Sequence, residues 1–209
     1  MNSSTGSMDP YVYPGTAVLR NIRDIRDAAL LSEFEAEATA RRLRQLERKP
    51  LRGHFDAPHL QAVHRYIFQD VYAWAGKFRT VNISKSGDSF AFQEHILSNL
   101  DRTFEKLKGE AHLGGADLER FTQRAAYYLG EINAIHPFRE GNGRAQREFL
   151  RELGAKNGWE FDWSRITQRE MIEASRQSLR VNNSGLEAVL RAALDTPANK
   201  LKQPRPLAD

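Results

Sequence analysis

Apolar side chains recur at intervals of three or four residues along most of this chain, and this spacing limits the fold more than any other feature. An α-helix completes one turn in about 3.6 residues, so side chains at this spacing line up on one helix face. The clearest stretch predicts a helix over residues 21–47. Its apolar residues are Ile22, Ile25, Ala28, Ala29, Leu31, Phe34, Ala38, Leu43 and Leu46. The spacing therefore predicts a mainly α protein.

Further helices are expected downstream. Asp56 and Pro58 occupy the positions of an N-cap residue and a first-turn proline, which predicts a helix that runs to Phe68. The remaining helices are expected over residues 94–108, 116–134, 144–157, 168–180 and 185–194.

One segment departs from helical spacing. Residues 78–83 and 89–92 are short β-prone runs, and the polar, glycine-bearing residues 84–88 separate them. This order predicts a β-hairpin. An isolated hairpin is only marginally stable, so it is expected to lie on the helical body. A connector without any role is the other interpretation.

The two ends differ from the middle in composition. The first residues are polar, and the last stretch carries Pro197, Pro204 and Pro206 among basic residues. We expect a flexible tail over residues 1–8, one domain over 9–195, and a tail or linker over 196–209. A chain of 209 residues with 40% hydrophobic residues is large enough to build a real core.

Composition excludes several classes of function. No apolar run approaches the length of a membrane span, and the polar start lacks the order of a secretory signal, so a soluble cytoplasmic protein is expected. The absence of cysteine excludes disulfides, a thiol nucleophile and cysteine-based zinc sites. The net charge of +4 is modest, and its basic residues alternate with acids. Without a helix-turn-helix pattern, a zinc spacing or a Walker loop, no nucleic-acid binding is expected.

The densest chemistry lies in residues 136–147, which read HPFREGNGRAQR between two helical patterns. The motif is therefore expected to be a loop that leads into a helix. The first backbone N–H groups of a helix lack internal partners and lie at the positive end of its dipole. Gly141, Asn142 and Gly143 are thus placed to bind an anion, and their glycines allow close approach.

The side chains around this loop suit a polyphosphate. Arg144 and Arg147 are three residues apart and share a helix face, where both can hold phosphate oxygens. A carboxylate such as Glu140 would repel nearby phosphates, so its place here is explained by a divalent cation between them. Mg²⁺ prefers carboxylate and phosphate oxygens as ligands. His136 is the residue of the motif that can take up and release a proton near neutral pH.

Each residue also has a structural explanation when taken alone. A histidine at a helix end is often a cap, Gly-Asn-Gly is often a turn, and helix arginines are usually exposed to solvent. All of them together at one junction are hard to explain by structure. Phe138 is the exception, and we expect it to anchor the loop in the core.

The run matches, at every defined position, the motif H-P-F-x-D/E-G-N-G-R-x-x-R of the Fic family, which is named for filamentation induced by cyclic AMP. The resemblance extends over about residues 9–194 and includes residues 70–76 and 125–128. It is strongest to the toxin-type Fic proteins of toxin–antitoxin pairs. It implies a helical bundle domain in which the β-hairpin forms a flap beside the active site.

The resemblance implies a protein adenylyltransferase, which moves AMP from ATP to a Ser, Thr or Tyr hydroxyl of a target protein and releases pyrophosphate. By this resemblance His136 removes the hydroxyl proton and Glu140 holds Mg²⁺ on the ATP phosphates. The backbone of residues 141–143 forms the anion hole, with Asn142 at the α-phosphate. Arg144 and Arg147 bind the β- and γ-phosphates.

Two further regions receive roles from the resemblance. Four residues of the flap are expected to align the target segment by strand-like pairing: Ile83, Ser84, Lys85 and Ser86. Asn182 and Asn183 are candidates for the adenine pocket.

Many Fic enzymes inhibit themselves through a helix with the pattern S/T-x-x-x-E-G/N, whose glutamate pairs with the second motif arginine, here Arg147. This pattern is absent from the chain. The resemblance therefore favours a small antitoxin that supplies the helix in trans, and an unregulated enzyme is the alternative. Transfer of another nucleotide or phosphate-bearing donor, delivery into a host cell as an effector, and a catalytically idle binding module also stay open.

Overall fold

Helices make up most of the structure, a computed structural model that describes residues 9–85 and 87–200. The mainly α prediction is confirmed. The two short strands pair antiparallel, with Ser84 opposite Ser89. The elements in chain order are α1 (Ala28–Arg48), α2 (Ala57–Phe68), β1 (Ser84–Lys85), β2 (Asp88–Ser89), the 3-10 turn Gln93–His95, α3 (Ile96–Gly109), the 3-10 turn Ala111–Leu113, α4 (Leu118–Ile135), α5 (Asn142–Lys156), the 3-10 turn Trp163–Arg165, α6 (Gln168–Arg180), α7 (Ser184–Leu194) and α8 (Pro197–Lys200).

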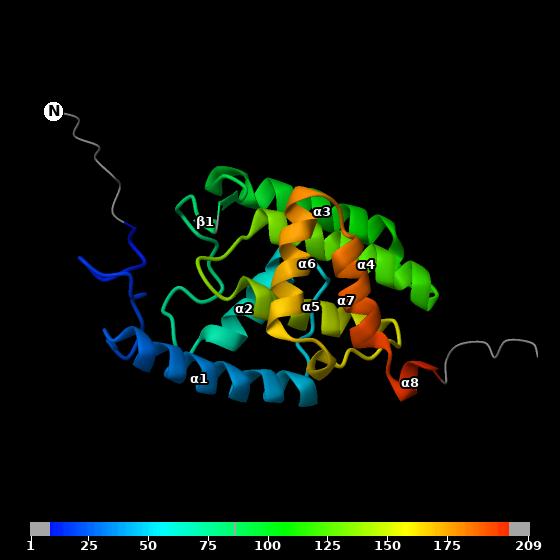
Figure 1. Ribbon diagram of the computed structural model, residues 1–209, viewed down its shortest axis with the longest axis horizontal. Coiled ribbons are helices and arrows are strands. Elements are labelled where there is room, and N and C mark those ends of the chain that lie inside the picture. Colours follow the sequence, from blue (N-terminus) through cyan, green and yellow to red (C-terminus); the bar gives the residue numbers. More distant parts are fainter. Residues whose placement is uncertain (1–8, 86, 201–209) are drawn as a thin grey trace, which may run out of the picture.

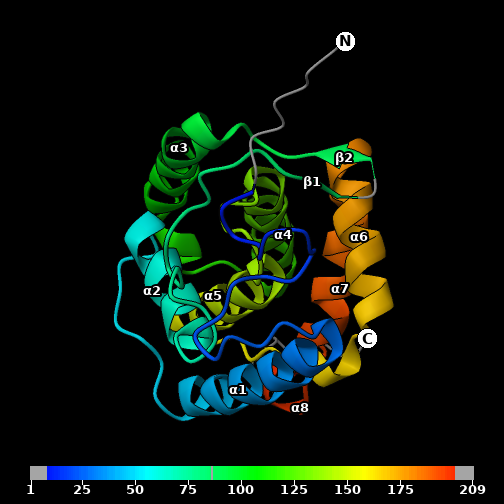
Figure 2. The ribbon, with the colours of Figure 1, turned by 90° about the vertical axis from the view of Figure 1, so that its left-hand side faces the viewer.

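Helix α4 is the centre of the bundle. It contacts α3, α5, α6 and α7, while α2 packs on α5 and α1 packs on α2 (Figures 1 and 2). Its side chains Phe121, Tyr128 and Ile132 are among the largest that are fully buried. Burial of this much apolar surface is the main source of stability for a fold of this kind. The C-terminus of α4 and the N-terminus of α5 meet at the motif, so the site begins at the end of this central helix.

The expected start of the first helix at residue 21 is wrong, because side chains take the backbone groups of residues 21–27. The Asn21 side chain accepts from the N–H groups of Arg23 and Ile25 and donates to the Ile25 carbonyl. The Asp27 carboxylate accepts from Ala29 and Leu30, which caps α1 at residue 28. Such local side-chain bonds compete with helix formation.

The hairpin exists, but its predicted strands are wrong. Pairing is confined to two residues on each side. Ser84, Lys85 and Asp88 fall in the stretch that was expected to be the turn, and Ser89 begins the second predicted strand. The expected strands 78–83 and 89–92 bond instead to the end of α4: the Arg79 N–H donates to Pro137 O and the Ala91 N–H to Ala134 O. Both legs of the flap are therefore held by backbone bonds to the end of α4 and the start of the motif.

The packed part of the chain extends past the expected boundary at residue 195. Helix α8 follows, and the Asn199 side chain is buried and donates to the carbonyls of Glu160 and Leu194. The expected tails over 1–8 and 201–209 lie outside the described residues. Across residues 9–85 and 87–200, none of the helices has both the length and the apolar composition to cross a membrane.

Two leucines of α3 test the burial pattern. Leu100 is fully buried, whereas Leu97 on the same helix is 54% exposed. We expect Leu100→Ala to lower the free energy of unfolding by about 3 kcal/mol, because it removes core contacts and leaves a cavity. Leu97→Ala changes the helix propensity by the same amount, but it should lower the free energy of unfolding by less than about 0.5 kcal/mol. Urea unfolding of both variants measures the difference, and equal losses would contradict the packing of α3.

Candidate active site

Two left-handed residues frame the motif turn between α4 and α5. His136 ends α4 with φ 49° and ψ 62°, and its N–H still donates to Ile132 O. Gly141 precedes α5 with φ 83°, where a side chain would collide with the Phe68 ring. Glycine adopts this conformation readily, but a histidine seldom does. The surrounding structure must therefore hold His136 in place.

The side chain of Asn142 closes the turn. Its Oδ1 accepts from the Phe138 N–H at 2.9 Å, and its Nδ2 donates to the Phe138 carbonyl at 2.8 Å. Both polar atoms of the side chain are thus used within the turn, and the role of Asn142 at the α-phosphate stays a prediction. The Gly141 N–H donates to the Glu140 carboxylate, and Gly141 supplies no side-chain cap to the N–H groups that follow. The predicted anion site would therefore use the N–H groups of Asn142 and Gly143.

Phe138 and His64 fix the turn from the core side. Phe138 is 1% exposed and stacks on the His64 ring, with centroids 3.8 Å apart. His64 Nδ1 accepts from the Gly76 N–H, and Nε2 lies 2.9 Å from Glu140 O. A neutral imidazole with its proton on Nε2 satisfies both partners. Burial lowers the pKa of His64 to about 4, which keeps it neutral.

The His136 ring is oriented by two neighbours. It stacks on Phe90 of the flap at 3.9 Å between centroids, and its Nδ1 lies 3.3 Å from Asn133 O. A proton on Nδ1 satisfies this carbonyl and makes Nε2 the basic nitrogen. The ring is half-buried, so it combines a fixed direction with access to the adjoining cavity.

A cavity of about 460 Å³ brings the expected catalytic and flap residues together. Its wall includes His136, Glu140 and Gly143 of the motif and Ile83 and Ser84 of the flap. The Glu140 carboxylate is 42% exposed and accepts from the Gly141 N–H at 2.9 Å. Lys85 lies in β1, and Ser86 lies outside the described residues.

The two motif arginines have different surroundings, although both were expected to bind phosphates from one face. The Arg144 guanidinium pairs with Glu35 of α1 at 2.5 Å, donates to Thr39 Oγ1 and lies over the Phe68 ring. Arg147 has no hydrogen-bond or ion-pair partner within residues 9–85 and 87–200. Burial lowers the pKa of Arg147, and the charge of Arg144 lowers it further. Arg147 is therefore the motif arginine with an unsatisfied charge.

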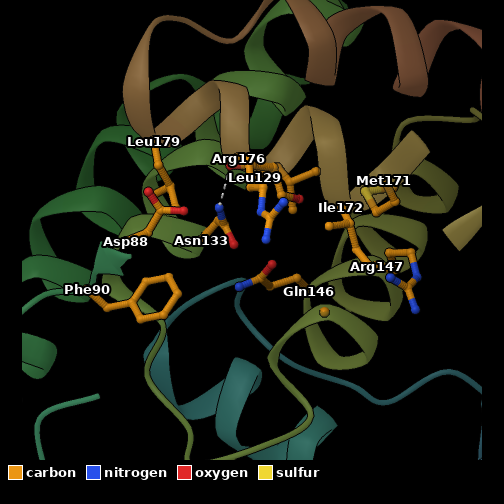
Figure 3. A pocket seen from close by; sticks show the side chains of 12 residues that line it. Asp88, Phe90, Leu129, Asn133, Gln146, Arg147, Met171, Ile172, Arg176 and Leu179 are labelled. Carbon is orange, nitrogen blue, oxygen red and sulfur yellow. Dashed lines mark hydrogen bonds between the residues drawn. The ribbon is translucent and has the colours of Figure 1, made fainter. Parts of the chain in front are cut away.

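A second cavity, of about 180 Å³, shares Phe90 and Gly143 with the first. Figure 3 shows the side chains that line it. It is mostly apolar and is enclosed by the flap, α4, α5 and α6. Gln146 Nε2 is buried there and has no hydrogen-bond partner in the described part of the chain, whereas Asn133 Nδ2 donates to Ser175 O. This amide donor is free to bond an acceptor atom that enters the cavity. The lining residues are Asp88, Phe90, Leu129, Asn133, Gly143, Gln146, Arg147, Met171, Ile172, Ser175, Arg176 and Leu179.

The adenine candidates Asn182 and Asn183 line neither cavity. Asn182 accepts from the N–H and hydroxyl of Ser184 at the start of α7, and Asn183 packs tightly on Gly130 of α4. Their side chains are used to join α6, α7 and α4. Sequence reasoning missed His64, Gln146, Glu35 and Phe90, because none of them belongs to a defined position of the motif.

His64 makes stability depend on pH. Its pKa is about 4 in the folded chain against an ordinary value of 6.5, so the unfolded chain binds more protons between these values. Stability is complete above pH 6.5 and falls as pH falls. In urea unfolding without nucleotide, we expect the free energy of unfolding of the original chain to fall between pH 7 and pH 5. The fall should exceed that of the His64→Gln variant by about 2 kcal/mol. Equal pH slopes would contradict a buried neutral His64.

Known proteins resemble this chain in sequence. The sequence profile of the Fic/DOC family matches residues 54–153. The chain is 42% identical to "Protein adenylyltransferase VbhT" of Bartonella schoenbuchensis, over 93% of the chain but 41% of that relative. It is 41% identical to "Probable protein adenylyltransferase y4lH" of Sinorhizobium fredii, over 88% of the chain and 94% of the relative.

Solved structures agree with the sequence matches. BepC, a VirB-translocated effector of Bartonella tribocorum solved with bound AMPPNP, has a TM-score of 0.84 at 27% identity, over 88% of this chain and 95% of that one. A Fic domain of Bartonella quintana with bound ADP also has a TM-score of 0.84, at 29% identity, over 88% and 93%. The expected Fic-type helical bundle is thereby confirmed. A complete motif on a braced turn, and a relative matched over nearly its full length, show that this chain belongs to the Fic/DOC family.

Proposed function

We propose that this chain is a protein adenylyltransferase that moves AMP from ATP to a hydroxyl side chain of a target protein and releases pyrophosphate. One observation carries the proposal: His136, the start of α5 and the flap residues Ile83 and Ser84 line one cavity. Related chains named adenylyltransferases support the choice of reaction.

Each residue of the site has a separate role in the proposed reaction. His136 Nε2 accepts the proton of the target hydroxyl, whose oxygen attacks the α-phosphorus while the bond to pyrophosphate breaks. The N–H groups of Asn142 and Gly143 stabilise charge on the phosphates, and Arg147 binds the terminal phosphates. Arg144 reaches them only after leaving Glu35 or by sharing its guanidinium between the two.

The second cavity is the site that we assign to the nucleoside. It shares Phe90 and Gly143 with the cavity beside His136, and Arg147 also lines it. Gln146 Nε2 is an unpaired donor for a ring nitrogen or a ribose hydroxyl. Its apolar lining suits the faces of a purine.

The site fits Mg²⁺ only together with a nucleotide. Within the described part of the chain, no group of three or more acidic, His or Cys side chains is placed to hold a metal ion. Glu140 is a single, partly exposed carboxylate beside the anion site, and Mg²⁺ is commonly bound by one carboxylate plus substrate phosphates. Glu140 would hold the ion, which supplies positive charge to the phosphates.

Regulation in trans by a small antitoxin is part of the proposal. The chain lacks the inhibitory pattern S/T-x-x-x-E-G/N, and the guanidinium of Arg147 is unpaired among residues 9–85 and 87–200. A glutamate from a partner helix would supply the missing counter-charge. A donor such as ATP favours the cytoplasm as the place of reaction, in the producing cell or in a cell that receives the protein.

The reaction is tested with labelled ATP. We expect the purified chain with Mg²⁺ and cell lysate to transfer label from α-labelled ATP, but not from γ-labelled ATP, to a protein band. His136→Ala should abolish labelling while calorimetry still detects ATP binding, because the base does not hold the nucleotide. Transfer of the γ-label would indicate a kinase, and no transfer from either position would favour an idle binding module. Mass spectrometry of the band identifies the modified residue.

Arg147 is tested by ATP affinity. Because it has an unsatisfied charge, we expect Arg147→Ala to raise the Kd for ATP roughly 10-fold to 100-fold, the range for loss of a charge-assisted hydrogen bond. Arg120→Ala removes the same charge from an exposed position at the far end of α4 and is the control. Calorimetric titration gives both values, and a similar Kd for the two variants would refute the phosphate role.

A further inference from the structure

Arg79 is a buried charge next to the catalytic histidine. Its side chain is 2% exposed, and its guanidinium donates to four backbone carbonyls. Nε donates to His136 O at 2.8 Å and Nη1 to Val81 O at 2.6 Å. Nη2 donates to Ala91 O at 2.5 Å and to Ile135 O at 3.2 Å. No carboxylate of the described residues forms an ion pair with it.

The four acceptors belong to two functional segments. Val81 and Ala91 lie where the chain enters and leaves the flap, and Ile135 and His136 form the end of α4. The backbone follows the same arrangement, since the Arg79 N–H donates to Pro137 O and the Ala91 N–H to Ala134 O. Phe90, next to Ala91, stacks on the His136 ring. Both legs of the flap and the catalytic turn therefore form one hydrogen-bonded unit.

A buried guanidinium is expensive unless its donors are satisfied. Burial lowers the pKa of Arg79, as expected for a charge removed from water. Carbonyl dipoles on several sides take the place of a carboxylate partner. The planar guanidinium has five N–H donors, so it can bond several of these carbonyls at once. A lysine ammonium presents its donors from one point and cannot reproduce that geometry.

We propose that Arg79 is a positioning residue that fixes the flap and the left-handed His136 relative to each other. A target segment that pairs with the flap is then presented to the base in a constant register. This consequence rests on the proposed adenylyl transfer. Transfer requires the hydroxyl, the base and the α-phosphorus to be aligned, and a displacement of about 1 Å costs on the order of 100-fold in rate.

Arg79→Lys tests the proposal because it keeps the charge and removes the fork. With α-labelled ATP and lysate, we expect the maximal initial rate of protein labelling to fall about 10-fold to 100-fold. The KM and calorimetric Kd for ATP should stay within about twofold, because Arg79 lines neither cavity. The matched control is Arg151→Lys, a largely buried arginine that bonds Glu148 and Leu46 O away from the site. It should leave rate and affinity unchanged.

Hydrogen exchange provides a second measurement that does not need a target. In Arg79→Lys, the hydrogen-bonded amides of Ala91, His136, Phe138 and Gly141 should exchange at least about 10-fold faster, while those of α3 keep their rates. A purely structural role would instead speed exchange throughout the bundle. Unchanged exchange in the flap and turn, or a labelling rate within twofold of the original, would overturn the proposal. If the original chain labels nothing, adenylyl transfer fails and exchange still decides the role of Arg79.

Exchange in the unaltered chain covers the case in which Arg79→Lys does not fold. A single unit predicts that the amides of Arg79, Ala91 and His136 open together, with protection factors within about threefold of one another. Protection of Ala91 more than about 100-fold below that of His136 would show that the flap opens independently, which would also overturn the proposal.

Discussion

Three buried polar side chains, Arg79, His64 and Asn142, hold the turn between α4 and α5, and the site depends on them. A turn of this kind has no helical or strand ladder to satisfy its backbone, so other groups must do so. Arg79 bonds the carbonyl of His136, His64 that of Glu140, and Asn142 both backbone groups of Phe138. These bonds lie in a low-dielectric interior, where leaving one unmade is costly. The rare conformation of His136 persists because its surroundings are fixed.

Charge is arranged unequally around this turn. Glu35 neutralises Arg144, while Arg147 stays partly buried beside the start of α5, where backbone donors also converge. An anion that enters therefore meets dipoles and a charge that are already oriented, which is how preorganised sites stabilise phosphate transfer. The flap closes the other side through Phe90, which connects the orientation of the base to the segment proposed to hold the target.

Helical periodicity predicted the helices well, since apolar spacing reflects the face that a helix buries. Predicted and observed bounds of α6 coincide, and those of α4 differ by two residues at the start and one at the end. The errors arose where side chains or distant segments take the backbone bonds. Asn21 and Asp27 delay α1, and the end of α4 binds the flap legs that looked like strands. Local spacing carries no signal for such competition.

The sequence by itself determined the helical class and the position of the motif, and it predicted the chemistry proposed for His136, Glu140 and the start of α5, because these depend on neighbours within a few residues. Only the tertiary structure separated Arg144 from Arg147, opened the cavity beside Gln146 and showed what braces the turn. Those contacts join Arg79 to His136 across 57 positions, His64 to Glu140 across 76, and Glu35 to Arg144 across 109. Packing of the bundle brings these residues together, and no local pattern encodes a contact over such separations.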